Sequence, residues 1–179
     1  MNQKAHITKT ALSLFAAQGY GNTSVAQIAK QAGVSQGLMY NFFSSKDALL
    51  EAILAEGMSD IANSILEYQN GAAPKDALRA HIKNTFRIVS ENNAYWRLFH
   101  SIRMQEPVRT LLGERYAAIQ KEILHTLTAT FRKLSYEHPK QEARIFFALI
   151  DGLVGHYLLD PSQFQLSLIQ KTLFKKYQL

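Results

Sequence analysis

Apolar residues recur at intervals of three and four along almost the whole chain, which is the spacing of one face of an α-helix. In the first segment, Ile7, Ala11, Leu14 and Phe15 form such a stripe. The two-residue alternation of a half-buried strand does not occur. Only 9 glycines and 4 prolines interrupt 179 residues. The pattern predicts an all-α fold of about nine helices.

Glycine, proline and capping residues divide this pattern into segments. Gly19 follows the first stripe, and glycine readily takes the backbone conformation found at helix C-termini. Pro74 is placed to open a helix, and residues 135–141 read as a turn. We expect the first helix to end at residue 18, and four more to span 25–32, 36–42, 46–68 and 74–90. The next should begin within 91–100, and the last three should span 108–134, 142–159 and 164–177.

Composition excludes several classes of protein. The chain has no cysteine, so disulfides and thiolate metal sites are excluded. No run of 18 apolar residues exists, and the nearest, residues 145–159, is interrupted by Asp151 and His156. The N-terminus lacks the pattern of a signal peptide. We expect a cytoplasmic protein with no membrane partner.

The charge is unevenly distributed along the chain. The net charge is +6, with +3 in residues 1–50, −4 in residues 51–70 and +7 in the remainder. A basic N-terminal block before an acidic segment is typical of a polyanion-binding head on a different body. Ordinary solvation of a surface remains the alternative.

Residues 23–42 have the spacing of a helix-turn-helix. Ser24 and Gln27 match a capping box, and a turn at Ala32 and Gly33 needs a glycine free to take a positive φ. Ile28, Val34 and Met39 are placed to lock the two helices together. The second helix then presents donors and acceptors to a groove, from Gln36, Tyr40 and Asn41, and Gly37 allows close approach.

The segment "LFAAQGYGNTSVAQIAKQAGVSQGLMYNFFSSKDALLEAIL" resembles the N-terminal domain of the TetR family of bacterial transcriptional regulators. The resemblance covers nearly all of residues 5–55, and the rest of the chain matches by architecture alone. It implies a DNA-binding domain over 1–46 and an effector-binding and dimerisation domain over 47–179. It further implies a homodimeric regulator, generally a repressor, that binds a palindromic DNA operator and is released by a small-molecule effector.

The family's DNA contacts carry over by position. Thr23 and Ser24 would bind a phosphate, as would Tyr40 and Lys46, while Gln36 would reach a base edge. Tyr40 as a packed tyrosine and Gln36 as a phosphate contact remain alternatives, and Leu38 departs from the threonine of many relatives. The implied DNA-binding set is Thr23, Ser24, Ser35, Gln36, Gly37, Leu38, Tyr40, Asn41 and Lys46.

Family members bind their effector among the middle helices, where this chain is rich in aromatic residues. An aromatic stripe at helical spacing belongs to a plain core more often than to a pocket. An inward-pointing arginine or histidine would favour an anionic or amphipathic ligand. The candidate pocket residues are Phe86, Tyr95, Trp96, Phe99, His100, Arg103, Met104, Tyr116, Phe146, Phe147, Ile150 and Asp151.

Residues 144–164 resemble the family's eighth helix and the turn after it, which form a four-helix dimer interface. Gly152 and Gly155 leave a smooth strip for a second helix, with an internal helix pair in a monomer as the less favoured alternative. The candidate interface residues are Gly152, Leu153, Gly155, Leu159, Phe164, Leu168 and Leu173.

Nothing in the sequence forms a convincing catalytic constellation. There is no H-x-x-x-H pair and no glycine-rich phosphate loop, and Asp151 and His156 lie off one helix face. An architectural DNA binder would need denser basic charge. We therefore expect no enzyme activity, no catalytic residue, no metal site and no cofactor.

Overall fold

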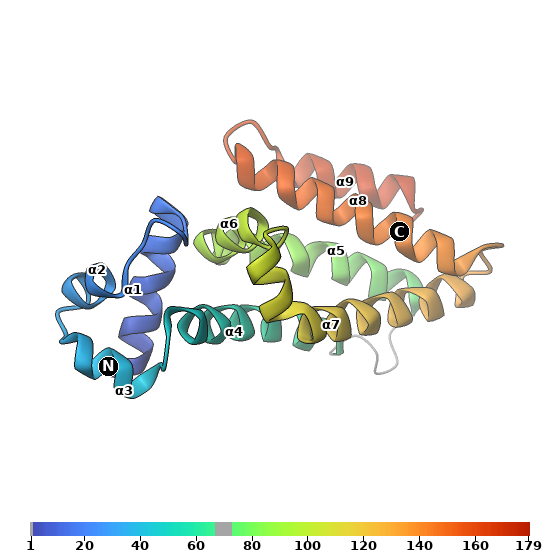
Figure 1. The fold of residues 1–179 in the computed structure, drawn as a ribbon. Coiled ribbons are helices and arrows are strands. Elements are labelled where there is room, and N and C mark those ends of the chain that lie inside the picture. Colours follow the sequence, from blue (N-terminus) through green and yellow to red (C-terminus); the bar gives the residue numbers. More distant parts are fainter. Residues whose placement is uncertain (1, 67–72) are drawn as a thin grey trace. The chain divides into compact units, whose positions relative to one another are not determined.

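The computed structural model describes residues 2–66 and 73–179, with all their side chains except those at 58–66, 106, 107, 112 and 115. Nine α-helices and no strand occur in this part of the chain (Figure 1), which confirms the predicted fold class. They are α1 (Gln3–Gln18), α2 (Val25–Gln31), α3 (Gln36–Phe42), α4 (Lys46–Leu66), α5 (Pro74–Glu91), α6 (Asn93–Ile102), α7 (Glu106–Lys133), α8 (Pro139–Leu159) and α9 (Leu166–Lys176).

Three helix starts differ from the prediction by two or three residues, and one of them is that of α7, which begins at Glu106 instead of residue 108. Helix α8 begins at Pro139, three residues before the predicted start, because proline suits the first position of a helix, where no amide donor is needed. Helix α9 begins at Leu166 instead of residue 164. Residues 67 and 68, at the predicted end of the fourth helix, lie outside the described residues.

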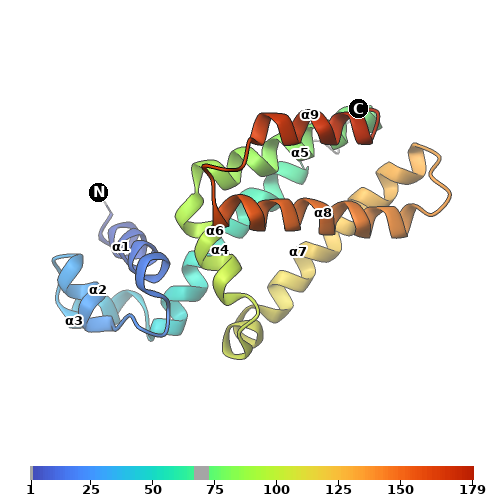
Figure 2. The same ribbon diagram turned by 90° about the horizontal axis from the view of Figure 1, so that it is seen from above.

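The helices divide into two compact units, Met1–Met58 with Ala94–Gly113 and Ser59–Asn93 with Glu114–Leu179. In the first unit, α2 contacts both α1 and α3, and these three helices form one group (Figure 2). Their shared interior is apolar, because Phe15, Ile28 and Met39, one from each helix, are at most 2% exposed. This small core holds the helix-turn-helix together.

Helix α6 packs closely against α4 within the first unit. The hydroxyl of Tyr95 donates to the backbone carbonyl of Leu54 at 2.9 Å. A Cβ atom built on Gly57 would lie 2.3 to 2.6 Å from atoms of the Tyr95 ring. Only glycine therefore lets the tyrosine ring reach α4 at this depth.

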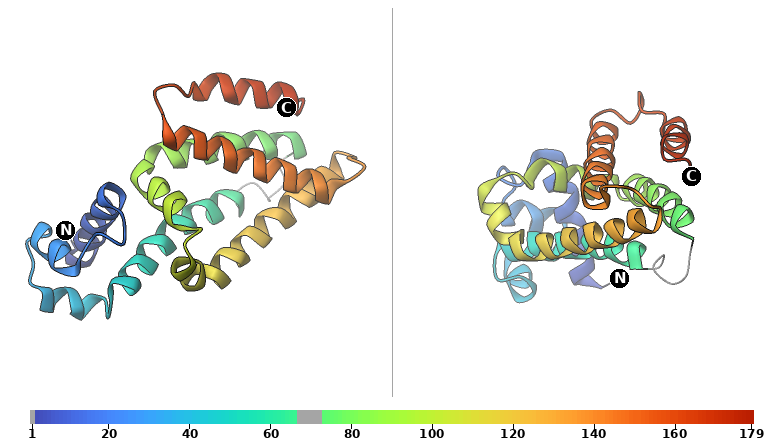
Figure 3. Two further views of the ribbon diagram at one scale, coloured as in Figure 1. Left: turned by 45° about the horizontal axis from the view of Figure 1, so that its top comes forward. Right: turned by 90° about the vertical axis from the view of Figure 1, so that its right-hand side faces the viewer.

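The second unit is built around α5, which contacts α8 and α9. Figures 2 and 3 show α9 running alongside α5. Its aromatic core joins Phe146 to Phe131 and Tyr177, with ring centroids 5.6 Å and 5.0 Å apart. His81 of α5 lies 5.9 Å from Phe146, and burial lowers the pKa of His81 to about 4.

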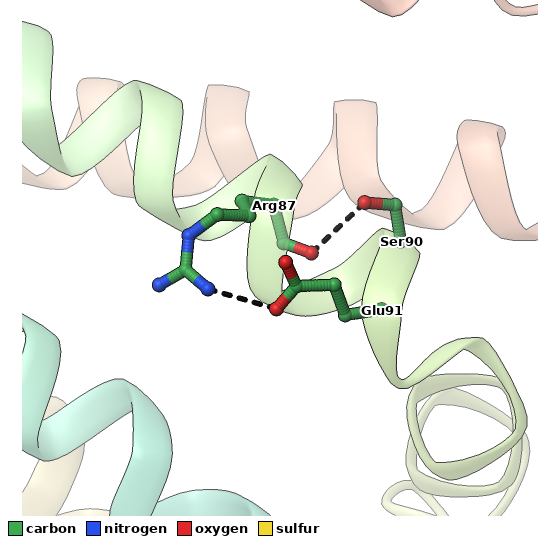
Figure 4. A network of polar contacts seen from close by, with 3 residues as sticks. All are labelled: Arg87, Ser90 and Glu91. Carbon is green, nitrogen blue, oxygen red and sulfur yellow. Dashed lines mark hydrogen bonds and ion pairs between the residues drawn. The ribbon is translucent and has the colours of Figure 1, made fainter.

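The outer face of α5 is polar. Arg87 and Glu91 form an exposed ion pair one helical turn apart, at 2.8 Å, and the Ser90 hydroxyl donates to the Arg87 carbonyl (Figure 4). An exposed pair of this kind stabilises a helix by only about 0.3 to 0.5 kcal/mol.

Among the described residues, no helix combines the length and apolar character needed to cross a membrane.

Candidate functional site

Helix α2 begins with the predicted capping box. The Ser24 hydroxyl accepts from the Gln27 amide at 3.2 Å, and the Gln27 side chain accepts from the Ser24 amide at 2.7 Å. Two backbone donors that would otherwise lack partners are thereby satisfied. This prediction is confirmed, and it fixes where α2 starts.

The turn between α2 and α3 also has the predicted geometry. Gly33 has a φ of 64°, a conformation that is costly for residues with a Cβ atom. The Val34 amide then donates back to the Ala29 carbonyl at 3.0 Å. The turn therefore sets α3 at a defined angle to α2.

Helix α3 has one buried and one exposed side. The Ser35 hydroxyl caps it by accepting from the Leu38 amide at 3.1 Å. Met39 is 2% exposed, and Phe43 just after the helix is 6% exposed, so these residues anchor it. The exposed positions are Gln36, Gly37, Tyr40 and Asn41, and Leu38 is half-buried.

Tyr40 is 52% exposed, so most of its large side chain is not packed against the protein. That exposure disfavours the alternative in which Tyr40 is a packed tyrosine. The face of α3 thus offers an amide, a phenol and a second amide around a glycine, with the chemistry needed to bind bases and phosphates.

Thr23 does not lie where the resemblance placed it. It is 1% exposed, and its hydroxyl donates to the Gly19 carbonyl at 2.9 Å. The hydroxyl therefore bonds within the turn after α1. In this structure the turn after α1 uses the only donor of the Thr23 side chain, and the phosphate contact of Thr23 stays a prediction.

Lys46 is also engaged inside the protein. Its ammonium donates to the carbonyls of Tyr20 and Thr23, at 2.9 Å and 3.0 Å, and lies 4.3 Å from the centroid of the Tyr20 ring. The Tyr20 hydroxyl donates to Asp47. Burial, reinforced by the Asp47 carboxylate, raises the pKa of Tyr20, so it stays a donor.

Sequence reasoning did not identify Tyr20 and Asp47. No local spacing links a residue in a turn to a helix start more than twenty positions later. A tyrosine between two glycines was the only available signal.

Half of the candidate pocket residues belong to α6 and the turn after it. Tyr95, Trp96 and Phe99 are buried and touch one another, with Tyr95 and Trp96 rings 4.9 Å apart and Trp96 and Phe99 rings 5.6 Å apart. The Arg103 guanidinium lies 5.8 Å from the Phe99 ring, and the half-buried His100 ring lies 6.0 Å from it. Buried aromatic rings and two basic side chains therefore lie next to one another along α6 and the turn after it.

Met104 is 82% exposed in the turn after α6, so within a single chain it is not enclosed with the other candidate pocket residues. The indole nitrogen of Trp96, by contrast, is buried and has no hydrogen-bond partner among the described residues.

The other pocket candidates belong to the second unit. Phe86, Phe146 and Ile150 are at most 4% exposed, and Phe146 sits in the aromatic core described above. For these three, as for Tyr95 and Phe99 of α6, such low exposure also fits the alternative of a plain core. Tyr116, Phe147 and Asp151 are half-buried.

The predicted dimer face is largely on the surface. Leu159 is 82% exposed and Leu168 is 55% exposed. A Cβ atom on the exposed Gly152 would meet nothing within 4 Å. Leu153, Gly155 and Phe164 are half-buried.

Two residues change the composition of that face. Leu173 does not belong to the exposed face, contrary to the prediction, because it is 4% exposed and already buried within a single chain. Ile145, which was not among the predicted interface residues, is 57% exposed on α8.

No group of three or more metal-binding side chains occurs in the described part of the chain.

Comparison with known proteins decides the family. Residues 7–53 match the model of bacterial regulatory proteins of the tetR family, and residues 74–175 match the C-terminal domain of BetI-type transcriptional repressors. The chain belongs to the TetR family. It is a DNA-binding transcriptional regulator with the helix-turn-helix in α2 and α3.

Individual relatives agree with this assignment. The regulator BetI of Stenotrophomonas maltophilia is 30% identical over 142 residues, which span 75% of this chain and 70% of that protein. Bacillus subtilis FadR, solved with stearoyl-CoA, has a TM-score of 0.77 at 21% identity, covering 96% of this chain and 95% of that one.

AibR, solved with isovaleryl coenzyme A and operator DNA, has a TM-score of 0.74 at 24% identity and covers 96% of both chains. At these identities, FadR and AibR establish the shared fold alone.

Proposed function

We propose that this regulator is a repressor that binds a palindromic operator as a homodimer, reads it with α3 and is released by a small molecule. The observation that carries the proposal is the two-sided character of α3. Met39 is buried beneath the helix, while Gln36, Tyr40 and Asn41 are exposed above it. A helix held only for packing would not present three polar groups together on a capped, rigid turn.

Each exposed group has a distinct role in the proposed complex. Gln36 contacts a base edge, because its amide both donates and accepts. Tyr40 and Ser24 contact phosphates, and Asn41 contacts a base or a phosphate. Ser35 and Gly37 let the start of α3 approach the groove, and Leu38 packs against a sugar or a thymine methyl group.

The proposed homodimer forms through the exposed apolar face of α8 and the turn after it. Leu159 and Ile145 would lose their accessible surface there, and Gly152 would allow a second helix to approach. A twofold dimer places two copies of α3 in successive major grooves, about 34–36 Å apart. Two half-sites then supply the affinity that one short helix lacks.

We propose an anionic, amphipathic effector. Arg103 and His100 lie against the aromatic residues of α6, and arginine binds carboxylates and phosphates in bidentate fashion. Stearoyl-CoA in FadR and isovaleryl coenzyme A in AibR have this chemistry, an acyl chain joined to phosphates. The buried Trp96 indole N–H is available to an acceptor on such a ligand.

Release requires only that the effector bind one of two shapes of the dimer more tightly than the other. Helix α4 contributes residues to both compact units. We propose that the effector shifts α4 and thereby changes the separation of the two α3 helices. The protein acts in the cytoplasm, without catalysis.

The operator can be found by fluorescence anisotropy on DNA fragments tiled from the region upstream of the gene, with unrelated DNA as the control. We expect one fragment to bind far more tightly than the control, with two protomers or a multiple of two per site. Uniform weak binding with a steep salt dependence would mean that only a basic surface is at work, and would contradict the proposal.

The effector class can be tested on the operator complex with stearoyl-CoA, using coenzyme A alone and a cationic detergent of equal chain length as controls. Release by stearoyl-CoA, but by neither coenzyme A nor the cationic detergent, would support an anionic, amphipathic effector. Release by the cationic detergent alone would overturn the assignment while leaving operator binding intact.

A further inference from the structure

Contacts of Lys46 and Asp47 join the start of α4 to the turn between α1 and α2, so they link the two ends of the helix-turn-helix. Lys46 bonds the carbonyls of Tyr20 and Thr23, and the Tyr20 hydroxyl bonds Asp47. The segment between these points, residues 21–45, contains all of α2 and α3. Both ends of the DNA-reading segment are therefore tied together at the first turn of α4.

Tyr20 is itself fixed within the protein. Its ring packs edge-on against the buried ring of Phe15, with centroids 5.1 Å apart. Its face receives the Lys46 ammonium at 4.3 Å, a favourable arrangement of a cation over an aromatic ring. The α1–α2 turn is thus held from α1 on one side and from α4 on the other.

These contacts compete with any phosphate for Lys46. Two of the three N–H donors of its ammonium are occupied by backbone carbonyls. The carboxylate of Asp47 binds the same tyrosine that the ammonium covers. A phosphate that approached Lys46 would have to displace charge-assisted hydrogen bonds and would also approach a like-charged carboxylate.

We propose that Lys46 is a positioning residue for operator binding, and not a phosphate contact. Together with Tyr20 and Asp47 it forms a clasp that holds the helix-turn-helix against the start of α4. The clasp sets the orientation in which α3 meets the groove, and it makes α4 and the α1–α2 turn move together. This inference rests on the operator binding proposed above.

The salt dependence of binding separates positioning from phosphate contact. Lys46→Met keeps most of the length of the side chain and removes its charge, and Tyr20→Phe removes only the hydroxyl. Lys9→Met removes a charge from an exposed lysine of α1 and serves as the control. For each variant we would measure the thermal midpoint, the operator affinity well below that midpoint, and the slope of log affinity against log salt.

The proposal expects Lys46→Met and Tyr20→Phe to weaken operator binding in the same direction, Lys46→Met by about tenfold, the equivalent of one hydrogen bond to a charged group. The salt slope should not change beyond the small effect of Lys9→Met. A phosphate contact predicts instead that Lys46→Met lowers the slope by about 0.9 for each protomer, while Tyr20→Phe leaves affinity unchanged. That result would overturn the proposal.

A third result would also overturn it. If both variants lower the thermal midpoint but the folded proteins bind the operator as tightly as wild type, the clasp is merely structural. If no fragment proves specific, the proposed function fails, and the slope on a nonspecific duplex still decides whether Lys46 neutralises a phosphate. Tyr20→Phe keeps the test valid if Lys46→Met does not fold.

Discussion

Replacing Gly57 by alanine should destabilise the protein, although the same substitution usually strengthens a helix. In a helix interior, alanine is favoured over glycine by about 1 kcal/mol. At Gly57, however, the new methyl carbon would lie 2.3 to 2.6 Å from ring atoms of Tyr95. That ring is 4% exposed, and its hydroxyl is held by the Leu54 carbonyl at 2.9 Å, so it cannot move aside freely.

The magnitude follows from these opposing contributions. Overpacking of a core costs about 1 to 3 kcal/mol, and losing the tyrosine hydrogen bond costs about a further 1 kcal/mol. After subtracting the gain in helix propensity, we expect a net loss of about 1 to 3 kcal/mol. For a chain of this size each kcal/mol lowers the thermal midpoint by about 2 to 4 °C.

Calorimetry or urea denaturation of Gly57→Ala would measure the effect, with Gly113→Ala as the matched control. Gly113 lies inside α7, and a Cβ atom there would meet nothing within 4 Å, so that variant should be unchanged or stabilised. In a Tyr95→Leu background, Gly57→Ala should lose most of its cost. A Gly57→Ala protein as stable as Gly113→Ala would refute the close packing of α6 on α4.

Three further predictions concern the surface, the operator and pH. Gly152→Arg should leave the folded chain intact but raise the dimer dissociation constant by at least about tenfold, since a buried unpaired charge costs several kcal/mol; analytical ultracentrifugation would check this, and an unchanged dimer would exclude that face of α8. Gln36→Ala should change the preferred base at one operator position, whereas Tyr40→Phe should weaken all sequences about equally; equal losses on every sequence for Gln36→Ala would remove it as a base reader. Burial holds the pKa of His81 at about 4 in the folded state, against about 6.5 when unfolded, so the unfolded state binds more protons between these values. Stability should fall by about 2 kcal/mol from pH 7.5 to pH 5, as seen in urea midpoints, and His81→Leu should abolish that part of the pH dependence.

Local signals were sufficient to predict the helix-turn-helix. Ser24 and Gln27 form the capping box that their spacing indicated, and Gly33 takes the positive φ that its turn requires. These features depend on residues within four positions of one another. The backbone and side chains at such short range have few alternatives, so the sequence pattern was reliable there.

Contacts between distant residues could not be predicted in the same way. Lys46 was expected to face DNA, but the structure gives it two carbonyls more than twenty residues earlier in the chain. Thr23, expected to contact a phosphate, is buried, and its hydroxyl bonds the Gly19 carbonyl at the end of α1. Periodicity identified Leu173 as apolar but did not show whether a neighbouring helix or a second chain covers it, and it is already buried in one chain.

The central claim, that two copies of α3 read one operator, is tested most directly by a hydroxyl-radical footprint on the specific DNA fragment. We expect two symmetric patches of protection whose centres are about 10 base pairs apart, or a multiple of that spacing. Tyr40→Phe should reduce both patches together. A single patch, or even protection along the whole fragment, would contradict the account.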